Sequence, residues 1–199
     1  YERADAESIA WRAGPVGSYF GALICQVGMF DAESLRMSQG EALFMDPQQR
    51  LLLQGAWEVL TASKTRSSPM GAFVGISSMD YSKTMSHYVT DVSPYAATGS
   101  ALSVAAGRVS YMYGLQGPAV STDTACSSSL VGSHIACDSM LLRECTMALA
   151  CGVNLTLAPD TGVVFKQAGM LAIDGRCKTL DADADGYVRG EACGVLLLD

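Results

Sequence analysis

Several kinds of segment are missing from this 199-residue chain. It has no run of eighteen apolar residues and no basic-then-apolar stretch at its start, so the sequence predicts neither a membrane span nor a secretory peptide. Its net charge is −7 and its 13 lysine and arginine residues form no cluster, which argues against nucleic-acid binding. Histidine is scarce as well, since His87 and His134 are the only two.

Cysteine is frequent, but its pattern is typical of free thiols. There are seven cysteines, an odd number, with irregular spacing and no Cys-x-x-Cys pair. Such spacing indicates neither a disulfide framework nor a zinc site. We therefore expect reduced thiols, no bound metal and a cytoplasmic location, with a plastid open as the alternative if a transit peptide precedes Tyr1.

The most informative segment surrounds Cys126. Residues 119–122 are short, partly β-branched and preceded by a Gly-Pro pair, which predicts a buried strand. Apolar residues from Leu130 to Leu141 recur at helical spacing, which predicts an amphipathic helix that begins close to Cys126. Free backbone N–H groups and the positive end of that helix would lower the thiol pKa and hold an oxyanion beside the sulfur. A cysteine in this position can attack an acyl group and carry it.

Two interpretations of Cys126 remain at this point. Free cysteine is among the most buried residue types, so a cysteine in a chain that is 49% hydrophobic can be plain core. The small residues on both sides of Cys126 favour a catalytic role, because they suit a tight strand-to-helix turn that a substrate must approach. A cysteine that only packs in the core does not require small neighbours.

Cys126 also lies within a long series of motifs. In chain order they are Met45–Leu53 with Trp57-Glu58, Thr98-Gly99, Ala106–Tyr111, Gly114–Pro118, Asp123–Leu130, Ala148–Asn154, Gly169–Leu171, Asp174–Asp181 and Gly186–Glu191. Together these motifs resemble the signature of β-ketoacyl synthases, specifically the ketosynthase domains of type I polyketide and fatty-acid synthases. The resemblance covers about residues 21 to 199, and the motifs at Met45 and Cys126 look most like the polyketide type.

The resemblance implies an α/β chain with a thiolase-like fold, layered α-β-α-β-α in the complete domain. A ketosynthase of this family is about twice as long as this chain and is built from two similar halves. Residues 1–199 would then be a partial domain, most of the N-terminal half, truncated at both ends.

The pattern of the chain agrees with this fold class. Helices are predicted at residues 41–63 and 100–112, and strands at residues 70–77 and 193–198, besides the strand and helix around Cys126, while residues 147–157 form an apolar run. Alternating elements with continuous apolar strands predict a sheet that is covered on both faces, in one domain without repeats.

The same resemblance implies a reaction and its partners. In the family, the cysteine takes an acyl chain from the phosphopantetheine of an acyl carrier protein, and two histidines help a malonyl-type extender to lose carbon dioxide. The resulting carbanion attacks the acyl-cysteine, a decarboxylative Claisen condensation. Cys126 would be the nucleophile, and its backbone N–H would form part of the oxyanion hole. No directly bound cofactor is implied, and the protein would be a homodimer in which residues 119–123 pair across the two-fold axis.

Neither catalytic histidine of the family can be placed on this sequence, because both motifs would follow Asp199. We expect His134 to pack on the apolar side of the Cys126 helix and His87 to lie in a loop or at the surface. The chain alone would then lack decarboxylation and condensation, while acyl loading onto Cys126 could survive.

Other motifs have structural explanations. Residues 181–186 copy half of an EF-hand loop, but position twelve is Ala192, so an exposed acidic turn is expected in place of a calcium site. Asp46-Pro47 suits a helix start, which assigns the Met45 motif to framework and interface. Phe165, Met170 and Leu171 fit either an acyl tunnel or ordinary core.

Three functional hypotheses stay open from the sequence. The first is a condensing ketosynthase, which the intact Cys126 favours. The second is a non-condensing relative that serves as a dimer scaffold or a gatekeeper for carrier proteins. The third is an unrelated cysteine hydrolase, although no local protease signature surrounds Cys126.

Overall fold

The structure is a computed structural model that describes residues 12–14, 17–63, 69–88 and 93–199. It contains two compact units, one made of residues 1–26 and 155–192 and the other of residues 27–154 and 193–199. Within the described ranges, no helix combines the length and the apolar character that crossing a bilayer requires.

The larger unit is built on a four-stranded sheet in the order β5-β4-β6-β8. β4 (Met70–Gly75) runs parallel to both β5 (Ala119–Thr122) and β6 (Met147–Asn154), and β8 (Ala192–Leu198) lies beside β6 at the edge. All six residues of β4 are buried, as expected of a central strand that is covered on both faces. The strands predicted near residues 70–77 and 193–198 are confirmed, and the apolar run at residues 147–157 contains β6.

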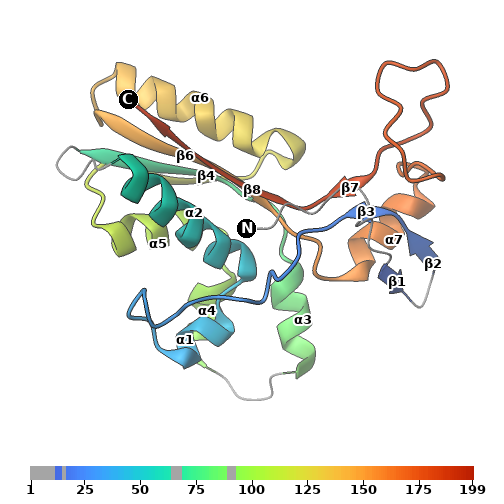
Figure 1. Ribbon diagram of the computed structural model, residues 1–199, viewed down its shortest axis with the longest axis horizontal. Coiled ribbons are helices and arrows are strands. Elements are labelled where there is room, and N and C mark those ends of the chain that lie inside the picture. Colours follow the sequence, from blue (N-terminus) through green and yellow to red (C-terminus); the bar gives the residue numbers. More distant parts are fainter. Residues whose placement is uncertain (1–11, 15–16, 64–68, 89–92) are drawn as a thin grey trace. The chain divides into compact units, whose positions relative to one another are not determined.

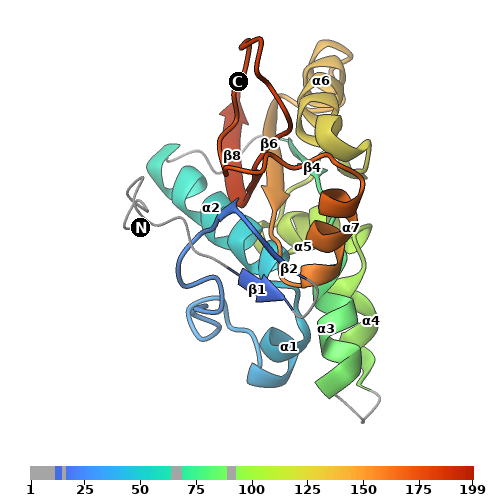
Figure 2. The same ribbon diagram turned by 90° about the vertical axis from the view of Figure 1, so that its right-hand side faces the viewer.

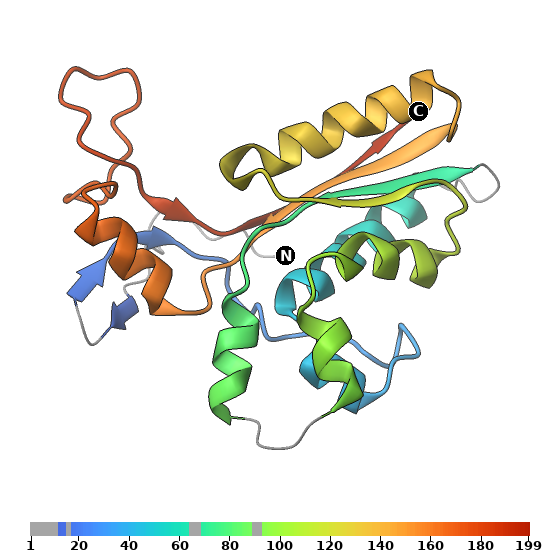
Figure 3. The same ribbon diagram turned by 180° about the vertical axis from the view of Figure 1, so that it is seen from behind.

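Helices cover both faces of this sheet. α6 (Ser128–Leu141) packs on one face, and α2 (Pro47–Ser63) with α5 (Val104–Tyr113) packs on the other (Figures 1 and 2). Between α6 and the sheet lies an apolar cluster that includes Phe73, Ala136 and Ala150. The view from behind shows the same three layers (Figure 3). The predicted sheet with two covered faces is therefore confirmed for this unit.

Two helix predictions were wrong in their extent. The single helix expected over residues 41–63 is two helices, α1 (Gln39–Phe44) and α2, because Met45 is extended and Asp46 precedes a proline, which disfavours helical geometry. The helix expected over residues 100–112 begins only at Val104, after α4 (Pro94–Ser100) has ended. α3 (Asp80–Tyr88) completes the helices of this unit that the described residues contain.

The prediction that β5 is a buried strand was wrong. β5 is an edge strand, so it has a strand neighbour on one side only, and Ala119 is exposed while the other three residues are half-buried. Its β-branched composition indicated a strand correctly, but composition does not distinguish an edge from a centre.

The smaller unit contains short elements. β1 (Arg12–Gly14) pairs antiparallel with β2 (Gly17–Tyr19), β3 (Gly21–Ala22) pairs parallel with β7 (Arg189–Gly190), and α7 (Pro159–Gln167) is its helix. A single bridge joins Leu171 to Tyr187. Gly186 makes that bridge possible, since its φ is +148° and a Cβ there would lie 2.5 Å from the backbone nitrogen of Ala172.

Candidate active site

Cys126 lies where the chain passes from the sheet to a helix. β5 ends at Thr122, a single 3-10 turn spans Ala125–Ser127, and α6 begins at Ser128. The predicted helix start close to Cys126 is therefore confirmed. The cysteine itself is exposed. Backbone N–H groups in the first turn of a helix have no intrahelical acceptor, but several of those around Cys126 are bonded within the turn, since the Ser127 N–H donates to the Thr124 carbonyl and the Ser128 N–H donates to the Ala125 carbonyl.

The turn contains an unusual backbone conformation directly before the cysteine. Ala125 has a φ of +56°, in the left-handed region that residues with a Cβ rarely adopt. Its N–H donates to the Oδ1 of Asp123 at 3.0 Å, and its carbonyl accepts from the Oγ of Ser128 at 2.7 Å. The N–H of Thr124 donates to the same Oγ at 2.9 Å. Hydrogen bonds that span only a few residues therefore close the turn around Cys126.

α6 approaches the sheet very closely beside this turn. A Cβ on Gly75, the last residue of β4, would lie 2.4 Å from the backbone nitrogen of Ser129. A Cβ on Gly152 in β6 would lie 2.6 Å from the Cβ of Ser129. β4 and β6 thus each have a glycine where α6 begins. The missing side chains allow the start of α6, directly after Cys126, to pack against these two strands.

This close approach overturns the predicted orientation of α6. The residues that are buried are small: Ser128, Gly132, Ala136 and Ser139. Of the larger apolar residues, Leu130 and Leu141 point outward, being 74% and 80% exposed, whereas Ile135 and Met140 are partly buried and pack against the core cluster. Apolar spacing alone could not reveal this, because the outer face of the helix is apolar too.

His134 does not have the environment that the sequence predicted, and for His87 only the loop alternative is wrong, while a surface position stays a prediction. His134 does not pack in the core, because its side chain is 72% exposed and its Nε2 lies 3.3 Å from the Oδ2 of Asp138. The backbone of His87 lies in α3 and not in a loop, and its side chain is outside the described residues.

The sequence model of a known family matches almost the whole chain. The family is described as "Beta-ketoacyl synthase, N-terminal domain", and the match covers residues 2–199. This chain belongs to the β-ketoacyl synthase family.

Curated relatives of this β-ketoacyl synthase chain are polyketide synthases. It is 44% identical over 194 residues to a phenolphthiocerol/phthiocerol polyketide synthase of Mycobacterium tuberculosis, a match that covers 94% of this chain and 10% of the relative. It is 43% identical over 206 residues to another phenolphthiocerol/phthiocerol polyketide synthase from the same species, covering 99% of this chain and 13% of that protein. The chain therefore spans only about a tenth of the length of these relatives.

Solved ketosynthases have the same fold. The ketosynthase from module 6 of the bacillaene synthase of Bacillus subtilis 168 matches with a TM-score of 0.81 and 34% identity, covering 96% of this chain and 34% of that one. An oxazolomycin ketosynthase domain of Streptomyces albus JA3453 matches with a TM-score of 0.80 and 34% identity, covering 90% and 32%. The predicted α/β class with a thiolase-like fold is confirmed.

The Met45 motif of the β-ketoacyl synthase chain is a buried polar junction. Asp46, Gln48 and Gln49 are each at most 2% exposed. The Oδ1 of Asp46 accepts from the Gln48 N–H at 2.8 Å and so caps α2, while the Asp46 N–H donates to the Gly99 carbonyl at 2.9 Å. The Nε of Arg108 on α5 donates to the Oε1 of Gln49 at 2.8 Å, and its Nη1 pairs with Glu41. The framework role predicted for this motif is confirmed.

The surroundings of Asp46 in this junction strongly affect its protonation. Burial raises the pKa of Asp46 to about 6, although the hydrogen bonds from Gln48 and the charge of Arg50 lower it. Near neutral pH the folded protein therefore holds a buried carboxylate at a cost in stability.

The EF-hand-like segment is an exposed turn that one lysine holds together. The Nζ of Lys178 lies 3.1 Å from the Oδ1 of Asp174 and 2.6 Å from the Oδ1 of Asp185, and Asp181 accepts from the Asp183 N–H. The predicted acidic turn is confirmed. In the part of the chain that the structure describes, no group of three His, Cys, Asp or Glu side chains could hold a metal ion.

The three residues that fitted either a tunnel or a core differ in burial. Leu171 is 8% exposed and Met170 is 44% exposed. The ring of Phe165 packs edge-on against Tyr187, with the guanidinium of Arg189 5.1 Å from its centroid. All of them belong to the smaller unit. Their possible role in binding an acyl chain stays a prediction.

The remaining cysteines separate into exposed and buried thiols. All seven cysteines lie in the described part of the chain, and each is a free thiol. Burial raises the pKa of Cys151 and of Cys193 to about 12, so these two thiols stay protonated at neutral pH. Cys126, Cys137, Cys25 and Cys177 are exposed.

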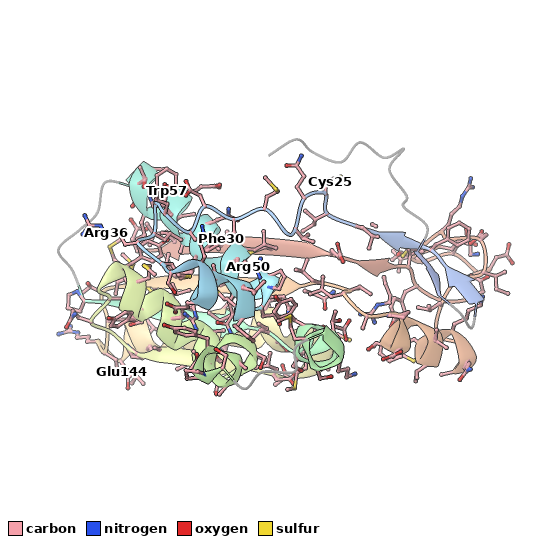
Figure 4. All side chains as sticks on the ribbon, turned by 90° about the horizontal axis from the view of Figure 1, so that it is seen from below. Cys25, Phe30, Arg36, Arg50, Trp57 and Glu144 are labelled. Carbon is pink, nitrogen blue, oxygen red and sulfur yellow. The ribbon has the colours of Figure 1, made fainter. Side chains whose placement is uncertain are left out.

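The larger unit also has a surface cavity of about 650 Å³ beside α1. Phe30, Met37 and Leu43 line it together with Arg36 and Arg50. Figure 4 shows Arg36 extending outward, away from Arg50, so the two guanidinium groups do not converge on one ligand. The Nε of Arg50 is already bonded to the Met45 carbonyl at 2.9 Å.

Sequence reasoning missed the residues that shape the turn. It treated Ser128 only as one of several small residues, and it gave Asp123 and Ala125 no role of their own. The one available signal was an acceptor side chain, Asp123, followed two residues later by a position whose N–H it can bind. The positive φ of Ala125 had no signal, because alanine rarely adopts it.

Proposed function

We propose that this chain carries the nucleophile of a condensing ketosynthase, and that the nucleophile is Cys126. The observation that carries the proposal is an exposed thiol at the entrance of α6, in a chain of the β-ketoacyl synthase family. The polyketide synthase names of its curated relatives favour polyketide over fatty-acid synthesis.

The first chemical step is a thioester exchange. The Cys126 thiolate attacks the carbonyl carbon of an acyl thioester on the phosphopantetheine of an acyl carrier protein. A new C–S bond to Cys126 forms, the old C–S bond breaks, and the carrier thiolate takes up a proton and leaves. The backbone N–H of Cys126, at the positive end of α6, donates to the oxyanion in between.

The second step forms the carbon–carbon bond. A malonyl-type extender on a carrier protein loses carbon dioxide, and its carbanion attacks the acyl carbon on Cys126. The C–C bond forms as the C–S bond breaks, and the Cys126 thiolate is regenerated. We assign neither decarboxylation nor proton transfer to His134, because it is exposed and paired with Asp138.

We also infer that residues 1–199 form most of one half of a two-half ketosynthase domain. Three observations support this: the matching family model is that of an N-terminal domain, the chain covers only about a third of solved ketosynthases, and Leu130 and Leu141 on the outer face of α6 are exposed. Next to that face, Cys137, Met140 and Leu141 of α6 and Leu197 and Leu198 of β8 line a groove of about 560 Å³. A second copy of the chain is inferred at the open edge of β5.

Intact mass spectrometry of the protein at its natural length tests the nucleophile. Incubation with an acyl-carrier thioester should add one acyl mass, and Cys126→Ala should abolish the addition. Cys25→Ala is the matched control, because Cys25 is an exposed thiol outside the groove beside α6 and should leave loading unchanged. Loading that survives Cys126→Ala would refute the assignment.

A second measurement tests condensation. When a malonyl-carrier thioester is added to the loaded protein, we expect release of carbon dioxide and a β-ketoacyl product on the carrier. Loading without either product would move the protein to the non-condensing class, that of a scaffold or gatekeeper.

A further inference from the structure

We propose that Ser128 is a positioning residue for Cys126, because its hydroxyl holds the left-handed backbone of Ala125 that presents the thiol. This inference rests on the proposed function, since it concerns the delivery of the same nucleophile.

The starting point is the unfavourable conformation of Ala125. Five non-glycine residues among those described have a positive φ, and Ala125, at +56°, is the one that precedes the candidate nucleophile. A residue with a Cβ does not hold this conformation unaided, because the Cβ crowds the following carbonyl. Something in the turn must therefore stabilise it.

Ser128 supplies two bonds of that restraint through one hydroxyl, in addition to the bond from its own backbone N–H to the Ala125 carbonyl. Its Oγ–H donates to the Ala125 carbonyl at 2.7 Å, and the Oγ accepts from the Thr124 N–H at 2.9 Å. These bonds hold the chain on both sides of the Ala125 α-carbon, since one reaches the Thr124 N–H before it and the other the Ala125 carbonyl after it. Asp123 adds a further bond, from the Ala125 N–H to its Oδ1 at 3.0 Å.

Burial makes this hydroxyl a firm anchor. Ser128 is 5% exposed, whereas Cys126, two residues earlier, is exposed. The backbone of Ser128 and Ser129 lies directly against Gly75 of β4, so the sheet fixes the anchor itself. Cys126 therefore lies between two restrained parts of the backbone, the hydrogen-bonded carbonyl of Ala125 and the start of α6.

Loss of this restraint should affect the rate of acyl transfer to Cys126 more than the binding of the acyl carrier protein. Thioester exchange needs the sulfur and the oxyanion-binding N–H of Cys126 in a fixed relative position. If the turn relaxes, both move, although the fold and the surface that receives the carrier protein are unchanged. Ser128 touches neither substrate nor sulfur in this scheme and acts only through the backbone.

Single-turnover acyl loading onto Cys126 in the protein at its natural length tests the proposal. Ser128→Ala should lower the loading rate at saturating acyl-carrier thioester by about ten- to a hundredfold and leave the half-saturating concentration nearly unchanged. The matched control is Ser133→Ala, which removes one bond from a hydroxyl on the same helix, to the Ser129 carbonyl at 2.8 Å, and should leave the rate unchanged. Equal rates for the two variants would overturn the proposal.

A second pair of variants tests the route through Ala125. In an Ala125→Gly background, glycine adopts the left-handed conformation without help, so Ser128→Ala should slow loading much less. If Ser128→Ala slows loading equally with and without Ala125→Gly, Ser128 does not act through the backbone of Ala125.

Two further variants keep the result interpretable. If Ser128→Ala fails to fold, Asp123→Ala weakens the same restraint from an exposed residue and should slow loading in the same direction, whereas an unchanged rate would count against the restraint. Loading that survives Cys126→Ala would refute the proposed function itself. Abolition by Cys126→Ala with full activity in Ser128→Ala would refute only the role of Ser128.

Discussion

The polar residues around Asp46 and those around Cys126 are held in different ways. The Asp46 junction is buried, and its bonds join residues that are far apart in the chain, such as Gln49 with Arg108 and Gln48 with the Ser78 carbonyl. The Cys126 turn is exposed, and its bonds span two to four residues. The junction therefore depends on the fold of the whole unit, whereas the hydrogen bonds that shape the turn are local and only its anchor, Ser128, is held against the sheet.

Breaking the junction at Arg108 should have the largest effect on stability. The Arg108 side chain is 9% exposed, and Arg108→Met removes the partner that it provides to both Gln49 and Glu41. We expect the free energy of unfolding to fall by about 3 to 4 kcal/mol, as when a buried pair is broken. Urea denaturation of the protein at its natural length measures it.

Arg36→Met is the control for this prediction. Arg36 is also an arginine of the larger unit, but it is exposed and its side chain makes no hydrogen bond or ion pair with another described residue. The variant should change stability by less than about 0.5 kcal/mol. Equal losses for the two variants would show that the junction bonds are not what stabilises the fold.

The ionisation of Asp46 makes the stability of the buried junction depend on pH. Its folded-state pKa of about 6 lies above the ordinary value of 3.8, so the folded protein keeps the proton that the unfolded chain releases as pH rises. Asp46 therefore contributes most to stability below pH 4, and this contribution is lost between about pH 4 and 6 and does not return at higher pH. The total loss is about 2 to 3 kcal/mol.

Asp46→Asn should remove this dependence, because asparagine still caps α2 but cannot ionise. The stabilities of the two proteins should be similar at about pH 4 and diverge toward pH 7 in favour of the variant. Urea denaturation at several pH values across that range measures this. Parallel profiles would contradict a raised pKa for Asp46.

Ser127→Ala, in the exposed Cys126 turn, should have the smallest effect on the free energy of unfolding. The Ser127 Oγ donates to the Thr124 carbonyl at 2.9 Å, but both residues are exposed, so water replaces the lost bond. We expect a loss of less than about 1 kcal/mol in the free energy of unfolding. A loss as large as that of Arg108→Met would mean that the turn, too, supports the whole fold.

The same contrast explains which features could be predicted from sequence. The strand, turn and helix around Cys126 follow from local signals, namely β-branched residues, small residues and helical spacing, and they were predicted correctly. The edge position of β5 and the outward-facing leucines of α6 depend on distant parts of the chain. The separation of α1 from α2 at Met45 was only partly predictable. Pro47 indicated a helix start, but no local signal showed that another helix ends just before it.

The site shows the same division. Cys126 could be chosen from its neighbours and from the resemblance of its motif. The role of Ser128 could not, because a serine at the first position of a helix serves equally well as a cap, a surface residue or an anchor. Only the coordinates show that its hydroxyl bonds to the backbone on both sides of a left-handed alanine.

The burial of β4 has a consequence during synthesis. Met70 pairs with Met147, so the ribosome must add 77 residues before the strand finds this neighbour. At ordinary rates of translation the wait is about 4 to 15 seconds, during which six apolar or glycine residues have no partner on that side. Pro69 directly before the strand, with Lys64 and Arg66 just upstream, is the kind of flank that keeps such a segment from pairing with other nascent chains.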